Sequence, residues 1–352
     1  MSFKDNIRKV TPYVAGEQPK VEGKIIKLNT NENPYPPAPG VRKLMDEMRL
    51  SDLRLYPNTF AEPLREVLAA RYGLKNENIF VGVGSDDVLA MAFLTFFAGE
   101  KPVLFPDITY SFYDVWAELF KIPYKRIPLD EEFKININDY SIPNGGIVIA
   151  NPNAPTGICE PLSFIEEMLK KNPDSLVIVD EAYIDFGGES AVSLLSKYEN
   201  LLVVQTFSKS RSMAGLRIGF AMGSAETISA MDAVKNSYNS YTMNYPSQIL
   251  GVEAVRDEAY FKETCEKIIA TRERSKKELA ALGFTFPDSK TNFIFATHKT
   301  MRAEDIAAGL RKKNIFVRHF SKPRIDNYLR ISIGTDEEMD AVFAVLKSLI
   351  HK

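Results

Sequence analysis

The chain has 352 residues, of which 45% are hydrophobic and 26% are charged, a composition typical of a soluble globular protein. This length exceeds the size at which a single hydrophobic core stops growing, so we expect one large domain and a smaller one. Lysine and arginine total 44 against 46 acidic residues, and the net charge of -2 argues against nucleic acid or an anionic membrane as a partner.

The remaining composition excludes several other classes of protein. The N-terminal sequence MSFKDNIRKVTPYV lacks the apolar core of a secretory signal, and no stretch reaches the roughly 18 apolar residues of a membrane span, so we expect a cytoplasmic protein. Cys159 and Cys265 lie far apart, which predicts neither a disulfide framework nor a thiolate metal site. The histidines His298, His319 and His351 show no ligand spacing, so no metal is expected.

The first two thirds of the chain alternate between apolar runs and helical patterns. Residues 1–40 are rich in proline, asparagine and glycine and predict an extended arm. The apolar runs predict strands at 79–84, 101–106, 146–152, 175–183, 200–210 and 216–223, with helices at 85–99, 110–120 and 161–171. Unbroken apolar strands separated by helices indicate an α/β domain whose mostly parallel central sheet is covered on both faces.

The pattern changes after Pro246. A long, charged helix is predicted at about 257–282. It is followed by a strand at 291–298, a helix at 303–313, strands at 315–320 and 328–334, and a terminal amphipathic helix at 337–350. This order is typical of a small α+β domain. We therefore divide the chain into an arm at 1–33 that packs with the small domain, a large domain at 34–246 and a small domain at 247–352.

Polar groups collect where the predicted strands of the large domain end. Ser85 and Asp86 open a helix after a glycine-containing strand, and free helix amides bind phosphate well. Asp180 ends another strand, and Lys209 follows a third, with Arg217 eight residues on. Each feature taken singly also fits a helix cap, a salt bridge or a solvated loop. Because ligands bind at the carboxyl ends of parallel strands, these groups are expected to meet there.

One kind of small molecule would satisfy all of these groups together. It carries a phosphate for Ser85, Asp86 and Arg217, a ring nitrogen for Asp180 and an aldehyde for Lys209. Pyridoxal 5'-phosphate has this set of groups, and we predict it as the cofactor.

The whole chain resembles the fold-type I pyridoxal-phosphate enzymes of the class I and II aminotransferases, and within them the histidinol-phosphate aminotransferase subfamily. The motifs that carry the resemblance are TPY at 11–13, LNTNENP at 28–34, LYPN at 55–58, GVGSDD at 82–87, DITYSFY at 107–113, NPNAPTG at 151–157, VDEAYIDF at 179–186, TFSKSRSMAGLRIGF at 206–220, TNFIFA at 291–296 and LRISIGT at 329–335. The resemblance implies a large domain that binds the cofactor and a small α+β domain at the C-terminus.

The resemblance also implies roles for particular residues. Lys209 is similar to the lysine that condenses with the cofactor aldehyde, Asp180 to the partner of the pyridine nitrogen, and Tyr183 to the phenol beside the ring oxygen. The other cofactor contacts that it implies are Ser85, Asp86, Tyr110, Ser208, Arg217 and, from the neighbouring subunit, Tyr56. The implied substrate contacts are Arg330, which receives an anionic group, and Tyr13, Asn31 and Arg318 around it. A homodimer with shared active sites follows from the implied role of Tyr56.

The chain departs from the family pattern at one position. The family places an asparagine directly before Pro-Thr-Gly, where it contacts the ring oxygen, and this chain has Ala154 there with Asn153 one step earlier. We expect Asn153 to take over the contact, or Tyr183 to make it without help.

The resemblance predicts a reaction in which histidinol phosphate gives its amino group to the 2-oxo acid 2-oxoglutarate, a step of histidine biosynthesis. Two alternatives share the fold and most motifs. One is an aromatic amino acid aminotransferase, and the other is a lyase similar to threonine-phosphate decarboxylase. Spacing does not distinguish them, because the outcome depends on which substrate bond stands perpendicular to the cofactor ring.

Overall fold

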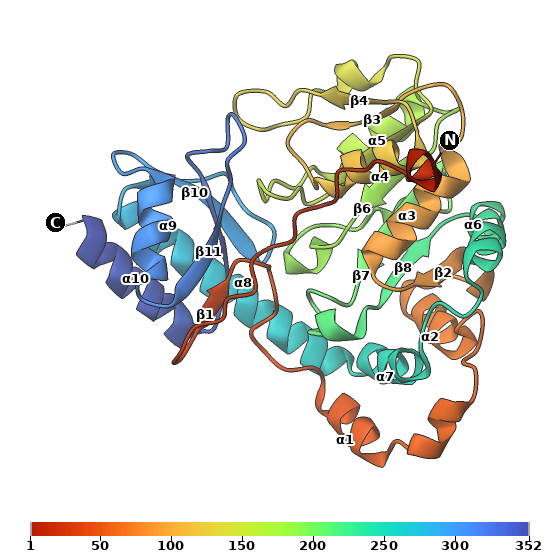
Figure 1. Cartoon of the computed structure of the whole chain (residues 1–352), viewed down its shortest axis with the longest axis horizontal. Helices are drawn as coiled ribbons and strands as arrows, with labels where there is room; N and C mark the ends of the chain where they lie inside the picture. The colour runs from red at the N-terminus through yellow and green to blue at the C-terminus, as the bar shows by residue number, and fades with distance from the viewer. Residues whose placement is uncertain (1, 351–352) are drawn as a thin grey trace.

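The computed structural model describes residues 2–350. Within this range the chain forms a seven-stranded sheet and a five-stranded sheet, which lie in two lobes joined by the long helix α8 (Glu258–Ala281) (Figure 1). The N-terminal segment runs from the larger lobe across to the smaller one. No helix in residues 2–350 combines the length and the apolar character needed to cross a bilayer.

The large sheet has the strand order β2-β8-β7-β6-β5-β3-β4. Its strands are β2 (Ile79–Gly82), β3 (Val103–Pro106), β4 (Tyr124–Ile127), β5 (Gly146–Ala150), β6 (Val177–Asp180), β7 (Leu201–Thr206) and β8 (Gly219–Met222). All neighbours are parallel except β8, which is antiparallel to both β2 and β7. Residues 207–218 hold only a short 3-10 turn instead of a crossover helix, so the chain returns antiparallel.

Helices cover both faces of this sheet. They are α1 (Pro39–Glu47), α2 (Glu62–Tyr72), α3 (Ser85–Phe96), α4 (Phe112–Phe120), α5 (Leu162–Lys171), α6 (Ala225–Tyr238) and α7 (Tyr245–Arg256). Along β6, Val177 and Val179 pack with the cluster that includes α2, α5 and α7. Ile178 between them packs with α3, α4 and α6, because successive strand residues point to opposite faces. The mostly parallel α/β fold predicted from the sequence is therefore confirmed.

The small sheet has the order β1-β11-β12-β10-β9. Its elements are β1 (Ile26–Leu28), β9 (Phe284–Thr285), β10 (Phe293–His298), β11 (Ile315–His319) and β12 (Leu329–Ser332), with helices α9 (Ala303–Arg311) and α10 (Asp336–Ile350). Strand β1 comes from the N-terminal arm and pairs in parallel with β11. Short 3-10 turns lie at Phe3–Asn6, Leu50–Arg54, Asn76–Asn78, Ile137–Tyr140, Ile184–Phe186, Ala191–Leu194 and Ala214–Leu216.

The packing differs from the domain limits drawn from the sequence. Leu250 and Ala254 of α7 lie in the core of the large domain, whereas Phe261 and Ile268 of α8 lie in the core of the small one. The cores therefore divide near Asp257, and a limit at 246 cuts α7 from the helices that it packs on. The sequence pattern also missed α1, α2, α6 and α7.

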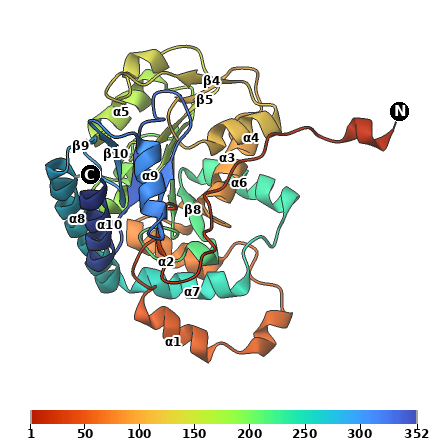
Figure 2. The ribbon, with the colours of Figure 1, turned by 60° about the vertical axis from the view of Figure 1, so that its left-hand side comes forward.

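The arm does not pack with the small domain along its whole length. Its first part lies against α4 of the large domain, where Tyr13 stacks on Phe112 with ring centres 4.1 Å apart and Arg8 donates to the carbonyl of Leu119. The view in Figure 2 shows the N-terminal end extending past α4 and away from the body. Only the later part of the arm, with β1, joins the small sheet.

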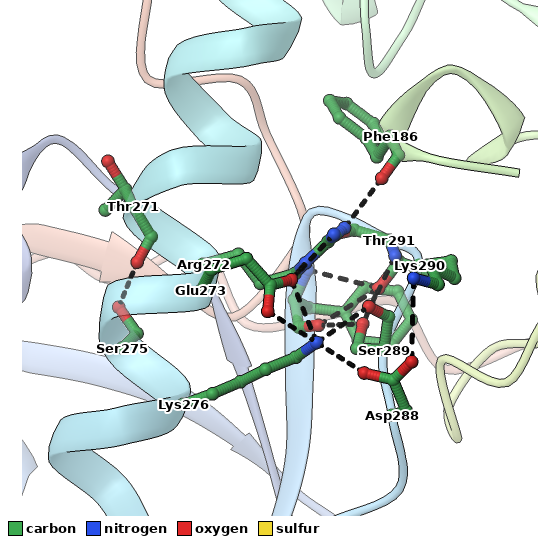
Figure 3. Close-up of polar contacts among 11 residues, drawn as sticks. Phe186, Thr271, Arg272, Glu273, Ser275, Lys276, Asp288, Ser289, Lys290 and Thr291 are labelled. Atoms are coloured by element: carbon green, nitrogen blue, oxygen red, sulfur yellow. Dashed lines mark hydrogen bonds and ion pairs between the residues drawn. The ribbon is translucent and has the colours of Figure 1, made fainter.

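Arg272 of α8 joins the two lobes close to the sheet edge. Its side chain is 2% exposed, and Nη1 donates to the carbonyl oxygens of Phe186 at 2.7 Å and Thr291 at 2.9 Å (Figure 3). Phe186 lies just beyond Tyr183, and Thr291 lies directly before β10. The guanidinium thus fixes the small domain to the segment that follows β6.

Candidate functional site

A cavity of about 180 Å³ lies at the carboxyl ends of β5, β6 and β7. It brings together eight of the residues predicted from the sequence: Ser85, Asp86, Tyr110, Asp180, Tyr183, Ser208, Lys209 and Arg217. The other residues that line it are Thr30, Glu32, Ala150, Pro152, Ala154, Ala182, Thr206 and Ala214. The walls therefore come from the arm, from three strand ends and from the start of α3.

One end of the cavity suits an anion. Gly84 caps α3 without a side-chain hydrogen bond, so the first amides of the helix face the cavity at Ser85 and Asp86. Arg217 Nη2 donates to Asp86 Oδ2 at 3.1 Å, and Tyr110 Oη donates to Asp86 Oδ1 at 2.7 Å. A Cβ on Gly84 would lie 2.5 Å from Arg217 Nη2, which is why this position suits glycine.

Two hydroxyl groups complete this end. Thr206 Oγ1 lies 3.0 Å from Ser208 Oγ, and it also accepts from the Ser208 amide at 3.2 Å. Ser208 was predicted, but Thr206 was not, although it ends β7 at the same edge of the sheet. The position of Thr206 at a strand end was the signal that could have found it.

Asp180 is the buried acid of the site, with 5% of its surface exposed. Tyr113 Oη donates to Oδ2 at 2.8 Å, and the amide of Ala182 donates to Oδ1 at 3.3 Å. Burial raises the pKa of Asp180 to about 6, although both hydrogen bonds act in the opposite direction. A carboxyl group without a close cationic partner is well suited to bind a cationic N–H group.

Tyr113 was missed by the sequence reasoning. Burial raises the pKa of its phenol well above the usual value, so the hydroxyl remains protonated and donates. It lies inside the DITYSFY motif, but sequence spacing does not tell which of the two tyrosines in the motif reaches β6.

Lys209 lines the cavity and is held by the N-terminal arm. Its Nζ donates to the carbonyl oxygen of Thr30 at 3.1 Å. Asn33 Nδ2 donates to the carbonyl oxygens of Lys209 at 3.1 Å and of Ser210 at 3.2 Å. These contacts place the arm directly over the lysine, so residues 30–33 are part of the site and not only a connection.

Tyr183 and Asn31 form a second contact between the arm and the sheet. Asn31 Nδ2 lies 2.9 Å from Tyr183 Oη, and Ser332 Oγ donates to Asn31 Oδ1 at 3.0 Å. Asn31 is 1% exposed and does not line the cavity. Both of its side-chain polar atoms have protein partners, and a contact of Asn31 with the substrate stays a prediction.

Asn153 does not take over the contact that Ala154 leaves open. Its Oδ1 accepts from Thr109 Oγ1 at 2.7 Å, and its Nδ2 donates to the Ile108 carbonyl and to Thr156 Oγ1, both at 3.0 Å. The side chain is buried away from the cavity, whereas Ala154 lines it. Of the two candidates named for the ring-oxygen contact, Tyr183 lines the cavity and Asn153 does not.

Two arginines predicted to bind substrate face each other on neighbouring strands. Arg318 of β11 and Arg330 of β12 are direct cross-strand partners. Arg330 Nη2 donates to the Asn29 carbonyl at 3.1 Å, its Nε has no partner within residues 2–350, and burial lowers its pKa. Like charges placed opposite each other destabilise a sheet unless an anion compensates them. Tyr13, the fourth predicted residue, lies near both guanidiniums, and burial raises its pKa.

Tyr56 lies outside the cavity and is 82% exposed. Its ring stacks on Tyr241 with centres 4.6 Å apart. It is not among the residues that line the cavity of its own chain.

A second buried acid lies behind Asp180 on the other face of the sheet. Glu181 accepts hydrogen bonds from Ser190 Oγ at 2.6 Å, the Ala191 amide at 2.7 Å and Gln205 Nε2 at 2.8 Å. Tyr72 Oη in turn donates to Gln205 Oε1 at 2.6 Å. Burial raises the pKa of Glu181 to about 7.

Comparison with known proteins agrees with this arrangement. The family "Aminotransferase class I and II" matches residues 23–346. The chain is 52% identical over 352 residues to the histidinol-phosphate aminotransferase of Lactococcus lactis subsp. lactis, covering 100% of this chain and 98% of that protein. It is 53% identical to the histidinol-phosphate aminotransferase of Clostridium botulinum over 99% and 98% of the two chains. The crystal structure of histidinol-phosphate aminotransferase from Sinorhizobium meliloti in complex with pyridoxal-5'-phosphate has the same fold, with a TM-score of 0.83, 23% identity and coverage of 93% and 92%.

Proposed function

Because the chain belongs to the class I and II aminotransferases, we propose that it transfers the amino group of histidinol phosphate to 2-oxoglutarate. The observation that carries this proposal is the identity of 52% with a histidinol-phosphate aminotransferase along the full chain. The same likeness favours this reaction over an aromatic aminotransferase or a decarboxylase. The predicted family membership, fold and reaction type are thereby confirmed.

The residues of the cavity fit the family's cofactor, pyridoxal 5'-phosphate. The α3 amides and Arg217 supply an anion site for the phosphate, and a Cβ on Gly219 would come within 2.3 Å of the Ser85 amide nitrogen, so the cradle is closely packed. Asp180 offers a buried carboxyl group for the ring nitrogen. Lys209 is the only primary amine among the residues that line the cavity. When bound, this cofactor supplies an electron sink for the substrate carbanion.

The chain's own residues would bind and orient the cofactor and transfer the substrate's proton. The Lys209 amine lies where it can hold a proton and move it to or from the reacting carbon. Asp180, kept in place by Tyr113, would accept a hydrogen bond from the protonated ring nitrogen. Hydrogen bonds within the cavity wall fix the side chains of Tyr110, Thr206 and Ser208, which would orient the cofactor. The charge-assisted bonds of the anion site contribute roughly 1.5 to 3 kcal/mol each, enough together to retain the cofactor through both half-reactions.

The substrate's anionic group would bind between Arg318 and Arg330. The guanidiniums are cross-strand partners, and that of Arg330 is partly buried. An anion with several acceptor oxygens satisfies both, which suits a phosphate monoester and a dicarboxylate alike. Tyr13 closes this region from the arm.

We also propose that two copies share their active sites and that the protein acts in the cytoplasm. Leu50, Leu55 and Tyr56 are 80%, 56% and 82% exposed and lie together in sequence, a surface that a second copy would cover. Cys159 and Cys265 are both free, which fits a reducing compartment. Sedimentation of the wild type and of Tyr56→Ala would test the pairing.

The reaction is tested by comparing turnover of histidinol phosphate, phenylalanine and threonine phosphate with 2-oxoglutarate. A preference for phenylalanine, or release of carbon dioxide without consumption of 2-oxoglutarate, would defeat the proposal. Borohydride treatment of the loaded protein should add mass at Lys209. Lys209→Ala should lower turnover by at least about 10³-fold.

A further inference from the structure

We propose that Asn31 is a positioning residue for Tyr183, and that it compensates for the alanine at position 154. In this role the Asn31 amide donates to the phenol oxygen, which leaves the phenol proton free to donate into the cavity. The inference rests on the proposed function only in that it requires the family's cofactor in the cavity.

The direction of the hydrogen bond is fixed by Ser332. The Asn31 backbone amide donates to Ser332 Oγ at 3.0 Å, and this hydroxyl then donates to Asn31 Oδ1 at 3.0 Å. The carboxamide oxygen is therefore used, and Nδ2 is the atom that faces Tyr183 Oη at 2.9 Å. An amide nitrogen is a donor only, so the phenol accepts this bond and keeps its own proton for another partner.

Residue 31 is held in place more firmly than a residue in an ordinary loop. Asn292 Nδ2 donates to the Asn31 carbonyl at 3.0 Å, and Asn31 has φ = 57°, a left-handed conformation that asparagine tolerates better than most residues. Tyr183 is also fixed, since its ring meets Phe293 edge-on with centres 5.1 Å apart. Two rigid partners keep the phenol oxygen at one position on the cavity wall.

The polar groups around Tyr183 explain why this contact has a function. Ala154 brings a methyl group to the cavity where the family has a carboxamide, and the Asn153 side chain is fully bonded elsewhere. Among the residues that line the cavity, Tyr110 already donates its phenol proton to Asp86, whereas the phenol proton of Tyr183 is free to donate. A donor to its oxygen polarises the phenol and strengthens the bond that it donates. By strengthening the hydrogen bond that Tyr183 donates, Asn31 compensates for the hydrogen bond that Ala154 cannot make.

The charged groups that face Tyr183 stay the same in the test variants. Lys209 Nζ lies 5.7 Å from the centre of the Tyr183 ring, and Arg330 interacts with the phenol from β12. Asp180 lies three residues earlier, at the end of β6. A change measured in a variant at position 31 therefore reports the phenol and not a lost charge.

The test measures the pH at which the visible absorption band of the loaded protein changes from its acid to its alkaline form. The alkaline form leaves negative charge on the ring oxygen, so a donor to that oxygen lowers this midpoint. Asn31→Gly removes the amide and keeps the left-handed backbone. We expect it to raise the midpoint by about one pH unit. Adding Ala154→Asn in the same chain should bring the midpoint back down.

Asn292→Ala is the matched comparison, because it loosens residue 31 but leaves the Asn31 amide in place to donate to the phenol, so we expect a smaller rise. An unchanged midpoint in Asn31→Gly would overturn the inference, and so would an equal rise in Asn292→Ala or a double variant that stays at the raised value. Affinity for pyridoxine 5'-phosphate, which cannot react with Lys209, gives a second reading and should fall more in Asn31→Gly than in Asn292→Ala. If only this inference is wrong, the wild type still turns over histidinol phosphate. If the proposed function is wrong, the wild type does not turn it over.

Discussion

Tyr113 donates a hydrogen bond of 2.8 Å to Asp180, and this bond connects helix α4 to the end of strand β6 at the cavity. The phenol comes from α4 and the carboxylate from the end of β6. Because Tyr113 is fully buried and Asp180 is nearly so, water does not compete for this hydrogen bond. It favours the ionised form of Asp180 and so opposes the effect of burial on the pKa of this carboxyl group.

Replacing Tyr113 with phenylalanine should weaken binding of pyridoxine 5'-phosphate at mildly acidic pH. The lost hydrogen bond raises the pKa of Asp180 beyond about 6, so the carboxylate needed by the ring nitrogen appears only at higher pH. We expect the pH midpoint of binding, measured by calorimetry between pH 5 and 8, to rise by about one unit. Tyr140→Phe is the control, because this buried hydroxyl has no partner within residues 2–350. Identical profiles for the two variants would contradict the prediction.

Asp180→Asn should stabilise the cofactor-free protein at alkaline pH. The native pKa of about 6 is above the ordinary value of 3.8, so the unfolded chain loses this proton first and stability falls as pH rises from 3.8 through 6. The variant avoids that cost and should gain about 2 to 3 kcal/mol at pH 8, a gain that shrinks below pH 6 and disappears near pH 4. Urea unfolding at pH 8, 6 and 5 measures it. A variant less stable than the wild type at pH 8 would count against the argument.

Glu181→Gln should remove part of the pH dependence of stability. Burial raises the pKa of Glu181 from 4.5 to about 7, so ionisation costs native stability as pH rises through this range. Between pH 6 and 7, above the range of Asp180, the wild type should lose about 1 kcal/mol that the variant does not lose. The measurement is the slope of the free energy of unfolding against pH. Its absolute value is not used, because glutamine also disturbs one of the three hydrogen bonds. Parallel slopes would show that Glu181 does not titrate here.

Arg272→Met should lower the free energy of unfolding by about 3 kcal/mol or more. The change leaves two buried carbonyl groups, those of Phe186 and Thr291, without their donor. Arg274→Met on the same helix removes exposed ion pairs with Asp336 and Asp340 and should cost less than about 1 kcal/mol. Chemical denaturation compares the two. Equal losses would mean that the buried contacts of Arg272 contribute no more than the exposed ones.

The sequence predicted the parts of the site that depend on strand ends. Asp180, Ser208 and Lys209 follow apolar runs, and a parallel sheet brings such ends to one edge whatever the details of packing. The fold class followed from the same alternation of strands and helices. The direction of β8 did not, because the short turn before it gives no periodic signal.

The parts that were missed depend on side-chain direction across tertiary contacts. Asn153 and Asn31 were expected to face ligands, and each is consumed by protein partners that lie 44 and 301 residues away. Tyr113 reaches Asp180 across 67 positions of sequence. Neither composition nor spacing encodes which way an amide or a phenol turns once the lobes meet.

The ion pair between Arg217 and Asp86 lies where the phosphate of the cofactor is expected to bind, so we expect the site to prefer strongly charged ligands. An arriving anion must compete with a carboxylate that already accepts from the guanidinium. A singly charged group replaces one attraction with an equal one and gains little, whereas a dianion gains a second charge-assisted bond from the helix amides. We therefore expect phosphorylated pyridoxal to bind more tightly than pyridoxal, which carries a neutral alcohol in place of the phosphate, even before the aldehyde reacts.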